Sequence, residues 1–195
     1  MTKPGTAVSL TDAIHGRRSV RAYAPQKLDQ ATIRTLLDAA VCAPTAIHEE
    51  PWEFVILQDA NALKRLSDRA RPLFVEEVHR AGLGRGGRRL DKFEHPDFNI
   101  FYNAGTLIVI CAKPVNPFVV ADCWLAAENL MLAAYAMGLG TCVIGSAVYG
   151  LNTPEIKNEL GIPVEVSAIA PIIVGVPGDQ PPATSRKKPQ ILAWK

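Results

Sequence analysis

A short basic stretch at residues 16–21, GRRSVR, holds the side chains best suited to bind an anion. In an extended chain, side chains alternate between two sides, so Arg17, Ser19 and Arg21 would face one way and Arg18 the other. Guanidinium groups offer forked donors and a permanent charge, which suits a phosphate. Isolated basic stretches are usually solvated surface, so a phosphate site here depends on what the rest of the chain provides.

The elements that must position this stretch follow from the hydrophobic pattern. A first helix leads directly into residues 16–21, and a second helix follows, with apolar residues every three or four positions until Pro44. The runs WEFVIL at 52–57 and TLIVICA at 106–112 are typical of strands, and the second is apolar enough to be buried on both faces. Side-chain caps are predicted for four helices, at Ser9, Asp29, Asp59 and Thr153.

The second half of the chain predicts one long helix between further strands. Residues 119–137 are apolar nearly all round, so this helix must be covered on most sides, in the core or at a subunit interface. Short strands are predicted at 141–144 and 164–174, and Pro171 indicates an edge or a bulge in the latter. Mixed helices and strands without a linker or repeat predict one α+β domain over residues 1–195.

Composition excludes several classes of protein. The chain has 195 residues, 48% of them hydrophobic and 21% charged, as expected of a globular domain. A net charge of +2 argues against nucleic acid as the main partner. The uncharged stretch 130–151 is interrupted by glycines and predicts a buried helix followed by a strand, not a membrane span. The glycine-rich basic residues 82–89 follow no clear strand, so they fail the context of a dinucleotide fingerprint and predict a surface loop.

The four cysteines predict a reducing environment. Cys42, Cys111, Cys123 and Cys142 form no CxxC pair and lie in apolar contexts. We expect buried free thiols and a cytoplasmic protein. Their spacing offers no zinc site, and no metal is expected.

Four stretches taken together resemble the FMN-dependent nitroreductase family. The stretches are AIHGRRSVRAY (13–23), LLDAAVCAPTAIHEEPWEFVIL (36–57), AENLMLAAYAMGLGTCVIG (127–145) and PIIVGVPGDQPPATSRKKP (171–189). They lie in the family's order and spacing, whereas residues 60–100 match the family poorly. The resemblance implies an α+β fold with a mixed central sheet flanked by helices. It also implies an intertwined homodimer with an FMN site at each end of the interface.

The resemblance assigns roles to the basic stretch. Arg17 and Ser19, with Arg18 beside them, match residues that hold the FMN phosphate and ribityl chain. Arg21 matches a basic residue near the pyrimidine edge of the flavin, where a cation favours the anionic reduced form. The resemblance implies three further groups of FMN contacts. The loop presented by the partner subunit contributes Pro44, Thr45, Ala46 and His48, and the segment against the reactive flavin edge contributes Val143, Ile144 and Gly145. The C-terminal basic cluster contributes Arg186, Lys187 or Lys188.

One loop departs from the family pattern. The usual serines, asparagine and glutamine before Pro-Trp are replaced by TAIHEE at residues 45–50. His48 can still donate a hydrogen bond but titrates near neutral pH. Glu50 places an acid where the family has a neutral amide, which is unfavourable against a reduced flavin. Alternatively, Glu49 and Glu50 form a solvated face of the loop.

The resemblance implies an NADH- or NADPH-dependent oxidoreductase. The reductant would deliver a hydride to FMN, and a nitroaromatic, quinone or related small acceptor would then take electrons in a ping-pong cycle. No catalytic side chain is needed for this chemistry. Two alternatives stay open: an FMN carrier or sensor with little turnover, and a specialised flavin enzyme such as a flavin destructase, dehalogenase or azoline dehydrogenase. The proline-rich tail 177–195 ends in apolar residues and is expected to wrap over the partner subunit.

Overall fold

A four-stranded sheet in the order β1-β2-β4-β3 forms the centre of the protein. We describe it from a computed structural model, which covers residues 7–82 and 90–195. The strands are β1 (Trp52–Leu57), β2 (Thr106–Ala112), β3 (Gly140–Val143) and β4 (Ser167–Gly175). The helices are α1 (Leu10–Gly16), α2 (Gln30–Ala40), α3 (Ala60–Arg80), α4 (Asp91–Glu94), α5 (Pro117–Ala136), α6 (Val148–Leu151) and α7 (Pro154–Leu160), with 3₁₀ turns η1 (Ala46–His48) and η2 (Gly145–Ala147).

The pairing between strands is antiparallel throughout the named sheet. β2 pairs with β1 on one side and with β4 on the other, and β3 pairs with β4. Among the described residues, one parallel pairing occurs, a bridge between Ser19 and Thr141 at the free edge of β3. The expected mixed sheet is therefore antiparallel in its four strands and mixed only through the basic stretch.

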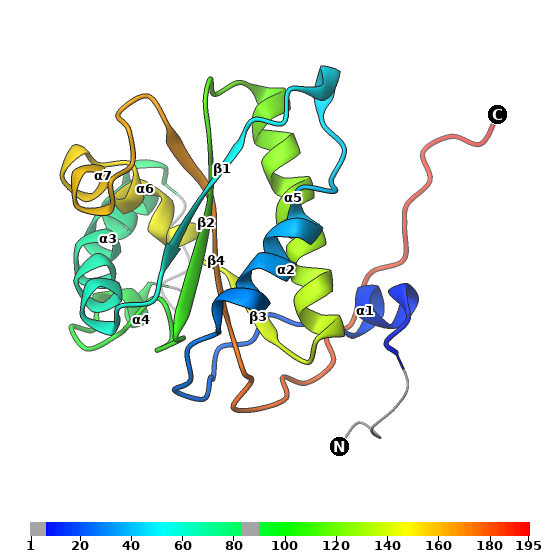
Figure 1. Ribbon diagram of the computed structural model, residues 1–195, viewed down its shortest axis with the longest axis horizontal. Helices are drawn as coiled ribbons and strands as arrows, with labels where there is room; N and C mark the ends of the chain where they lie inside the picture. Colours follow the sequence, from blue (N-terminus) through cyan, green and yellow to red (C-terminus); the bar gives the residue numbers. More distant parts are fainter. Residues whose placement is uncertain (1–6, 83–89) are drawn as a thin grey trace.

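Helices cover both faces of the sheet and complete the predicted α+β architecture (Figure 1). α2 and α5 pack on one face, and α3 with α6 and α7 lies on the other. Side chains of β2 alternate between the two resulting cores, with Ile108 and Ile110 in one, and Leu107 and Val109 in the other. This explains why 106–112 reads as a continuous apolar run: all seven residues of β2 are buried.

The four predicted caps are present. The Ser9 side chain accepts from the Asp12 amide at 3.1 Å, and the Asp29 and Asp59 carboxylates accept from the amides three residues on, each at 2.7 Å. Thr153 accepts from the Ile156 amide at 3.4 Å. Each cap satisfies an amide that has no partner inside its helix, so the helices begin where the sequence indicates.

Pro171 lies inside the sheet, so the prediction of an edge strand is wrong. β4 is flanked by β2 and β3, and Pro171 pairs with Val109. The alternative prediction of a bulge is confirmed nearby, because the register against β2 shifts between Ile110 and Cys111 and skips Ile169. A proline is tolerated where one side of the ladder is already irregular or ending.

Residues 60–80 form one continuous helix, α3, in which Pro72 is internal. The short helices α4 and α6 and the two 3₁₀ turns escaped the sequence pattern because each spans only three or four residues. The predicted loop at 82–89 lies, except for Gly82, outside the described residues.

α5 is long and apolar enough, by length and composition alone, to cross a membrane. In the fold, its inner side packs on the sheet and on α2. The uncharged stretch 130–151 is divided between the end of α5, β3, η2 and α6, as the glycine interruptions predicted. The outer side of α5 carries exposed apolar residues, among them Phe118, Trp124 and Leu125, which are 69%, 40% and 46% exposed.

Three of the four cysteines are buried as predicted, whereas Cys42 is exposed. Cys42 lies just beyond α2, past the buried Ala40, so it falls off the inward face of that helix. Burial raises the pKa of the Cys111 thiol to about 12 and that of the Cys123 thiol to about 11. These two thiols are therefore protonated core residues at neutral pH.

Candidate functional site

The basic stretch 16–21 is fixed along the edge of β3. The Val20 amide donates to the Thr141 carbonyl at 2.9 Å, and Ser19 bridges Thr141. Val20 is buried whereas Ser19 and Arg21 are exposed, so the chain alternates over residues 19–21. Arg17 and Arg18, which were expected to face opposite ways, are both half-buried and line the same cavity. A side chain at Gly140 would come within 2.7 Å of the Val20 methyl groups, so glycine at this position lets the stretch approach the sheet edge.

Two arginines of this stretch keep buried nitrogen atoms without partners. Arg18 Nη1 donates to the carbonyls of His15 at 2.7 Å and Arg17 at 2.8 Å, which satisfies the end of α1. Arg17 Nε is 3.6 Å from Glu128 Oε1, too far for a hydrogen bond. The Nε atoms of Arg17 and Arg18 are buried and donate no hydrogen bond to any described residue. Because buried donors are costly when unpaired, this arrangement favours an anionic ligand.

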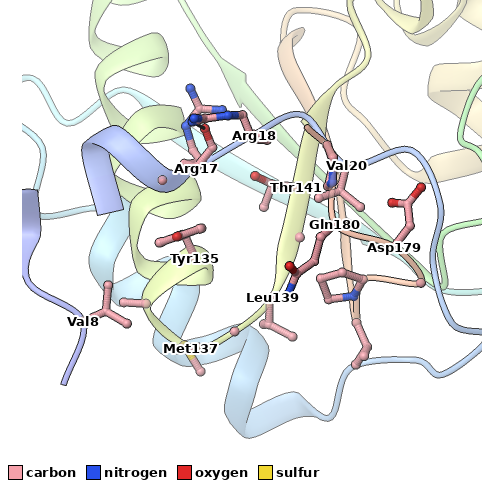
Figure 2. A pocket seen from close by; sticks show the side chains of 18 residues that line it. Val8, Arg17, Arg18, Val20, Tyr135, Met137, Leu139, Thr141, Asp179 and Gln180 are labelled. Carbon is pink, nitrogen blue, oxygen red and sulfur yellow. Dashed lines mark hydrogen bonds between the residues drawn. The ribbon is translucent and has the colours of Figure 1, made fainter. Parts of the chain in front are cut away.

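A cavity of about 990 Å³ opens beside these arginines (Figure 2). Arg17 and Arg18 lie at one side, and the turn from α5 into β3 forms the floor. The residues that follow β4, among them Asp179 and Gln180, form another wall of the cavity. The chain after β4 therefore contributes to the wall next to the predicted phosphate-binding residues.

Cys142 of β3 follows Thr141, the residue that bridges Ser19. Burial raises the pKa of the Cys142 thiol, while the positive charges of Arg21 and Arg17 act in the opposite direction. Tyr23 anchors the end of the stretch, because its hydroxyl donates to the Val20 carbonyl at 2.8 Å.

The predicted segment Val143–Ile144–Gly145 continues from the same strand. The Ile144 amide donates to the Pro171 carbonyl at 2.9 Å, and the chain then turns into η2. Ile144 is buried and Gly145 is exposed, with no protein atom within 4 Å of where its side chain would be. Since β3 carries both this segment and the basic stretch at its edge, the structure brings two of the four predicted groups together.

The predicted loop, Pro44 to His48, lies over α5 and points outward. The buried Asp122 carboxylate of α5 accepts from the Ala46 amide, with both oxygens at 3.3 Å. Three residues of the loop, Ile47, His48 and Glu50, have positive φ angles of 50°, 56° and 45°. His48, Glu49 and Glu50 are all exposed. In the single chain, the two glutamates therefore form the solvated face that was one of the sequence expectations.

The C-terminal basic cluster is not brought to the other predicted residues. Arg186 and Lys187 are exposed and irregular, and neither makes a hydrogen bond or ion pair with any residue in 7–82 or 90–195. The tail runs away from the body of the protein past α1 (Figure 1). Its apolar end is also uncovered, with Leu192 and Trp194 99% and 87% exposed.

Sequence reasoning missed three residues that touch the site. Asp122 holds the Ala46 amide, Glu128 lies beside Arg17, and the ring of Tyr102 lies under Arg21. The two acids did carry a signal, because they are isolated charges in an otherwise apolar helix and such charges need partners. Tyr102 carried none, since its position depends on a turn in the poorly matched part of the chain.

These features define an α+β protein with a basic stretch fixed along one edge of its sheet. The Nitroreductase family model matches residues 14–176, and the chain belongs to this family. A Methanothermobacter thermautotrophicus protein, provisionally named NADH dehydrogenase/NAD(P)H nitroreductase, is 28% identical over 180 residues, 89% of this chain and 80% of that protein. An iodotyrosine deiodinase of Thermotoga neapolitana is 25% identical over 92% of this chain and 94% of its own length. The fold matches that of a Bacteroides fragilis nitroreductase with bound FMN, with a TM-score of 0.81 at 24% identity over 95% of this chain and 98% of the other.

Proposed function

We propose that this protein is an FMN-dependent oxidoreductase that uses NADH or NADPH to reduce a small organic acceptor such as a nitroaromatic or a quinone. The observation that carries the proposal is the pair of buried Nε atoms of Arg17 and Arg18, on a stretch fixed to β3, which donate no hydrogen bond to a described residue. They fit the phosphate of FMN in a chain that belongs to the Nitroreductase family. When bound, FMN would supply hydride and electron transfer between reductant and acceptor.

The chain's own residues would bind, orient and tune this cofactor. Arg17 and Ser19 would hold the phosphate and ribityl chain, and Arg18 would fix the backbone that carries them. Arg21, further along the same stretch, would place a cation near the pyrimidine edge, where it favours negative charge on the reduced ring. The exposed backbone of Gly145 would let the flavin edge approach β3 closely.

We also propose that two copies of the chain complete each site. The loop at 44–48 and β3 lie toward opposite ends of the sheet (Figure 1). Among described residues, the side-chain hydrogen bond that holds this loop is the one from the Ala46 amide to Asp122 on α5. The exposed apolar side of α5 and the uncovered apolar tail both require a covering surface. A partner subunit would cover the helix, bring its Thr45, Ala46 and His48 to the flavin, and give residues 177–195 a surface to wrap over.

The first experiment is the absorbance spectrum of the purified protein, followed anaerobically after addition of NADPH or NADH. We expect flavin bands that bleach with one of the two reductants and recover on addition of a nitroaromatic or a quinone. Bands that persist with both reductants would indicate an FMN carrier or sensor instead. Absence of flavin bands, together with no uptake of added FMN, would overturn the proposal.

Substitution of Arg17 tests the phosphate contact. Arg17→Ala should weaken FMN binding by about 1.5–3 kcal/mol, or roughly 10- to 150-fold, if the guanidinium bonds a phosphate. Arg34→Ala on α2 removes the same charge from an exposed position and is the matched control. Equal affinities for FMN in both variants would show that the effect of Arg17 is only general charge.

Gly145 offers a test that leaves the fold intact. Gly145→Ala adds a methyl group into open space, so thermal stability should be unchanged. If the flavin edge lies against this backbone, however, FMN affinity or its rate of reduction should fall. An unchanged flavin affinity and rate would contradict contact at Gly145.

A second candidate is reductive dehalogenation, which the similarity to an iodotyrosine deiodinase favours. The two candidates share FMN and differ in the acceptor. Incubation of the reduced protein with iodotyrosine, with iodide release measured against a nitroaromatic control, distinguishes them. Iodide release faster than nitroaromatic reduction would favour the dehalogenase.

A further inference from the structure

The side chain of Arg21 lies over an aromatic ring contributed by a distant part of the chain. Its guanidinium carbon is 5.8 Å from the centroid of the Tyr102 ring, within the range of a cation–π contact. Within residues 7–82 and 90–195, Arg21 forms no ion pair with an acidic side chain. The tyrosine ring is therefore the contact that can define where this exposed guanidinium rests.

Tyr102 reaches Arg21 through a turn that is unfavourable for its backbone. Tyr102 and the next residue, Asn103, both have positive φ, at 51° and 56°. Bulky residues rarely adopt this left-handed region, and they stay there only when surrounding contacts hold them. Such a geometry points to a positional requirement for the side chain at 102.

Hydrogen bonds within the turn hold that geometry. The Tyr102 amide donates to the Asn99 carbonyl, and the Phe101 amide donates to Asn99 Oδ1, both at 2.9 Å. Asn99 Nδ2 in turn donates to Asn103 Oδ1 at 2.9 Å. The Asn99 side chain thus connects Phe101 and Asn103, and its backbone carbonyl holds Tyr102 between them.

The turn is also anchored in the core below. Phe101 is fully buried, and the neighbouring Ile100 amide donates to the buried Ser67 hydroxyl of α3 at 3.0 Å. Because the residues on the N-terminal side of Tyr102 cannot move without opening the core, the position of the Tyr102 backbone is fixed relative to the sheet.

A row of aromatic rings fixes the Tyr102 side chain itself. Its ring meets Phe98 edge-on with centroids 5.6 Å apart, and Phe98 meets Phe93 edge-on at 5.3 Å. Phe93 continues the row to Phe74 of α3 at 4.8 Å. Edge-to-face rings at these distances are mutually stabilising. The row therefore runs from α3 through α4 to the basic stretch.

We propose that Tyr102 is a positioning residue that holds the Arg21 guanidinium at the flavin, and so sets how strongly the protein favours the reduced cofactor. This inference rests on the proposed function, which places Arg21 near the pyrimidine edge of FMN. It assigns a role to the segment between β1 and β2, the part of the chain that matches the family poorly. Substitutions along the aromatic row would tune the cofactor from outside its binding site.

The test compares Tyr102→Phe, which keeps the ring, with Tyr102→Leu, which removes it; no hydrogen bond of the Tyr102 hydroxyl occurs among described residues. Tyr102→Leu should weaken binding of reduced FMN about two- to fivefold more than binding of oxidised FMN, the ratio that matches an exposed cation–π contact. The midpoint potential of bound FMN should fall accordingly. Tyr102→Phe should retain the wild-type potential.

Arg21→Met provides the reference, and the double variant Arg21→Met/Tyr102→Leu tests the coupling. Arg21→Met should lower the midpoint potential more than Tyr102→Leu does, and adding Tyr102→Leu should then change nothing further. A shift from Arg21→Met with none from Tyr102→Leu would overturn the inference and leave the proposed function standing. No shift from either variant would overturn the placement of Arg21 at the flavin, and the inference with it.

A readout without FMN separates positioning from folding. The ring current of Tyr102 should move the side-chain proton resonances of Arg21 upfield in the NMR spectrum of the apoprotein. This shift should persist in Tyr102→Phe and vanish in Tyr102→Leu, while thermal unfolding of both variants stays close to wild type. Loss of the shift in Tyr102→Phe as well would contradict a contact made by the ring.

Discussion

Within residues 7–82 and 90–195, two segments have non-glycine residues at positive φ, and their surroundings hold them in different ways. The turn at residues 99–104 is braced by three hydrogen bonds through Asn99 and by the buried Phe101. The loop at 46–50 has one anchor in the core, the Asp122 carboxylate, and its Ile47 is 91% exposed. Strain in the turn is supported by the chain itself, whereas strain in the loop has little such support, and in our proposal the partner subunit supplies it.

This difference bears on what each segment can do. A turn fixed by its own chain can position a side chain permanently, as we infer for Tyr102 and Arg21. A loop that depends on an external surface can be ordered by what it binds, which fits a loop that reaches a partner's cofactor. Predictions that weaken one segment and spare the other test the distinction.

The largest difference between the turn and the loop is expected when one apolar side chain in each is shortened to alanine. Phe101→Ala removes a fully buried ring and should lower the free energy of unfolding by about 3–5 kcal/mol. Ile47→Ala in the loop removes an exposed side chain and should change it by less than about 0.5 kcal/mol. Urea denaturation measures both. A loss above about 2 kcal/mol for Ile47→Ala would show that the loop packs against a partner subunit in solution.

The next effect concerns the hydrogen bond beneath the turn. Ser67→Ala leaves the Ile100 amide without its acceptor in a buried position, and should cost about 1–3 kcal/mol of unfolding free energy. Ser67→Thr keeps the hydroxyl and serves as the control for the lost bond. Equal stability of Ser67→Ala and wild type would mean that the turn does not depend on this bond.

A smaller, local effect is expected at the anchor of the loop. Asp122→Ala removes the acceptor of the Ala46 amide but also removes a buried charge, so the global unfolding free energy should change by less than about 1 kcal/mol. Exchange of the Ala46 amide hydrogen should nevertheless accelerate about fivefold, as loss of a 1 kcal/mol bond predicts. Asp122→Asn keeps an acceptor and should retain most of the protection. Unchanged exchange in Asp122→Ala would show that another group holds the loop.

The smallest effect compares the backbone strain of the loop with that of the turn. Glu50→Gly relieves a positive φ at an exposed residue without a recorded side-chain bond, and should raise stability by about 0.5–1 kcal/mol. Asn103→Gly relieves the same strain but loses the bond to Asn99, so no gain is expected. Thermal unfolding of both variants measures the difference. A gain in Asn103→Gly equal to that in Glu50→Gly would show that the turn is no better braced than the loop.

Much of the fold was readable from the sequence because it depends on local chemistry. Capping side chains at Ser9, Asp29, Asp59 and Thr153 mark helix starts, and the apolar run at 106–112 predicts a central strand. The features that the sequence did not reveal depend on how elements far apart in the chain pack together. The place of β4 inside the sheet follows from strand order, and the exposure of Cys42 follows from how α2 is oriented.

In the candidate site too, features that depend on local sequence were predictable and features that depend on tertiary contacts were not. The alternation of Ser19, Val20 and Arg21 is a property of an extended chain, so it was predictable, whereas Arg17 and Arg18 follow the end of α1 and lie at one cavity. The buried Asp122 and the half-buried Tyr102 lie far from the basic stretch in sequence and reach their contacts only through tertiary packing. The roles of the C-terminal arginine and lysines stay predictions, because the single chain gives them no contact.

Pro171 determines where its neighbouring strand ends. The Ile144 amide bonds the Pro171 carbonyl, but proline has no N–H to return a bond to the Ile144 carbonyl. That carbonyl instead accepts from the Ala147 amide at 2.9 Å, and this bond closes the first turn of η2. β3 is thereby released from the sheet after Val143, and Gly145 is turned outward. Because Pro171 lacks an N–H, the backbone at Gly145 is exposed, and this is the surface against which we propose the flavin lies.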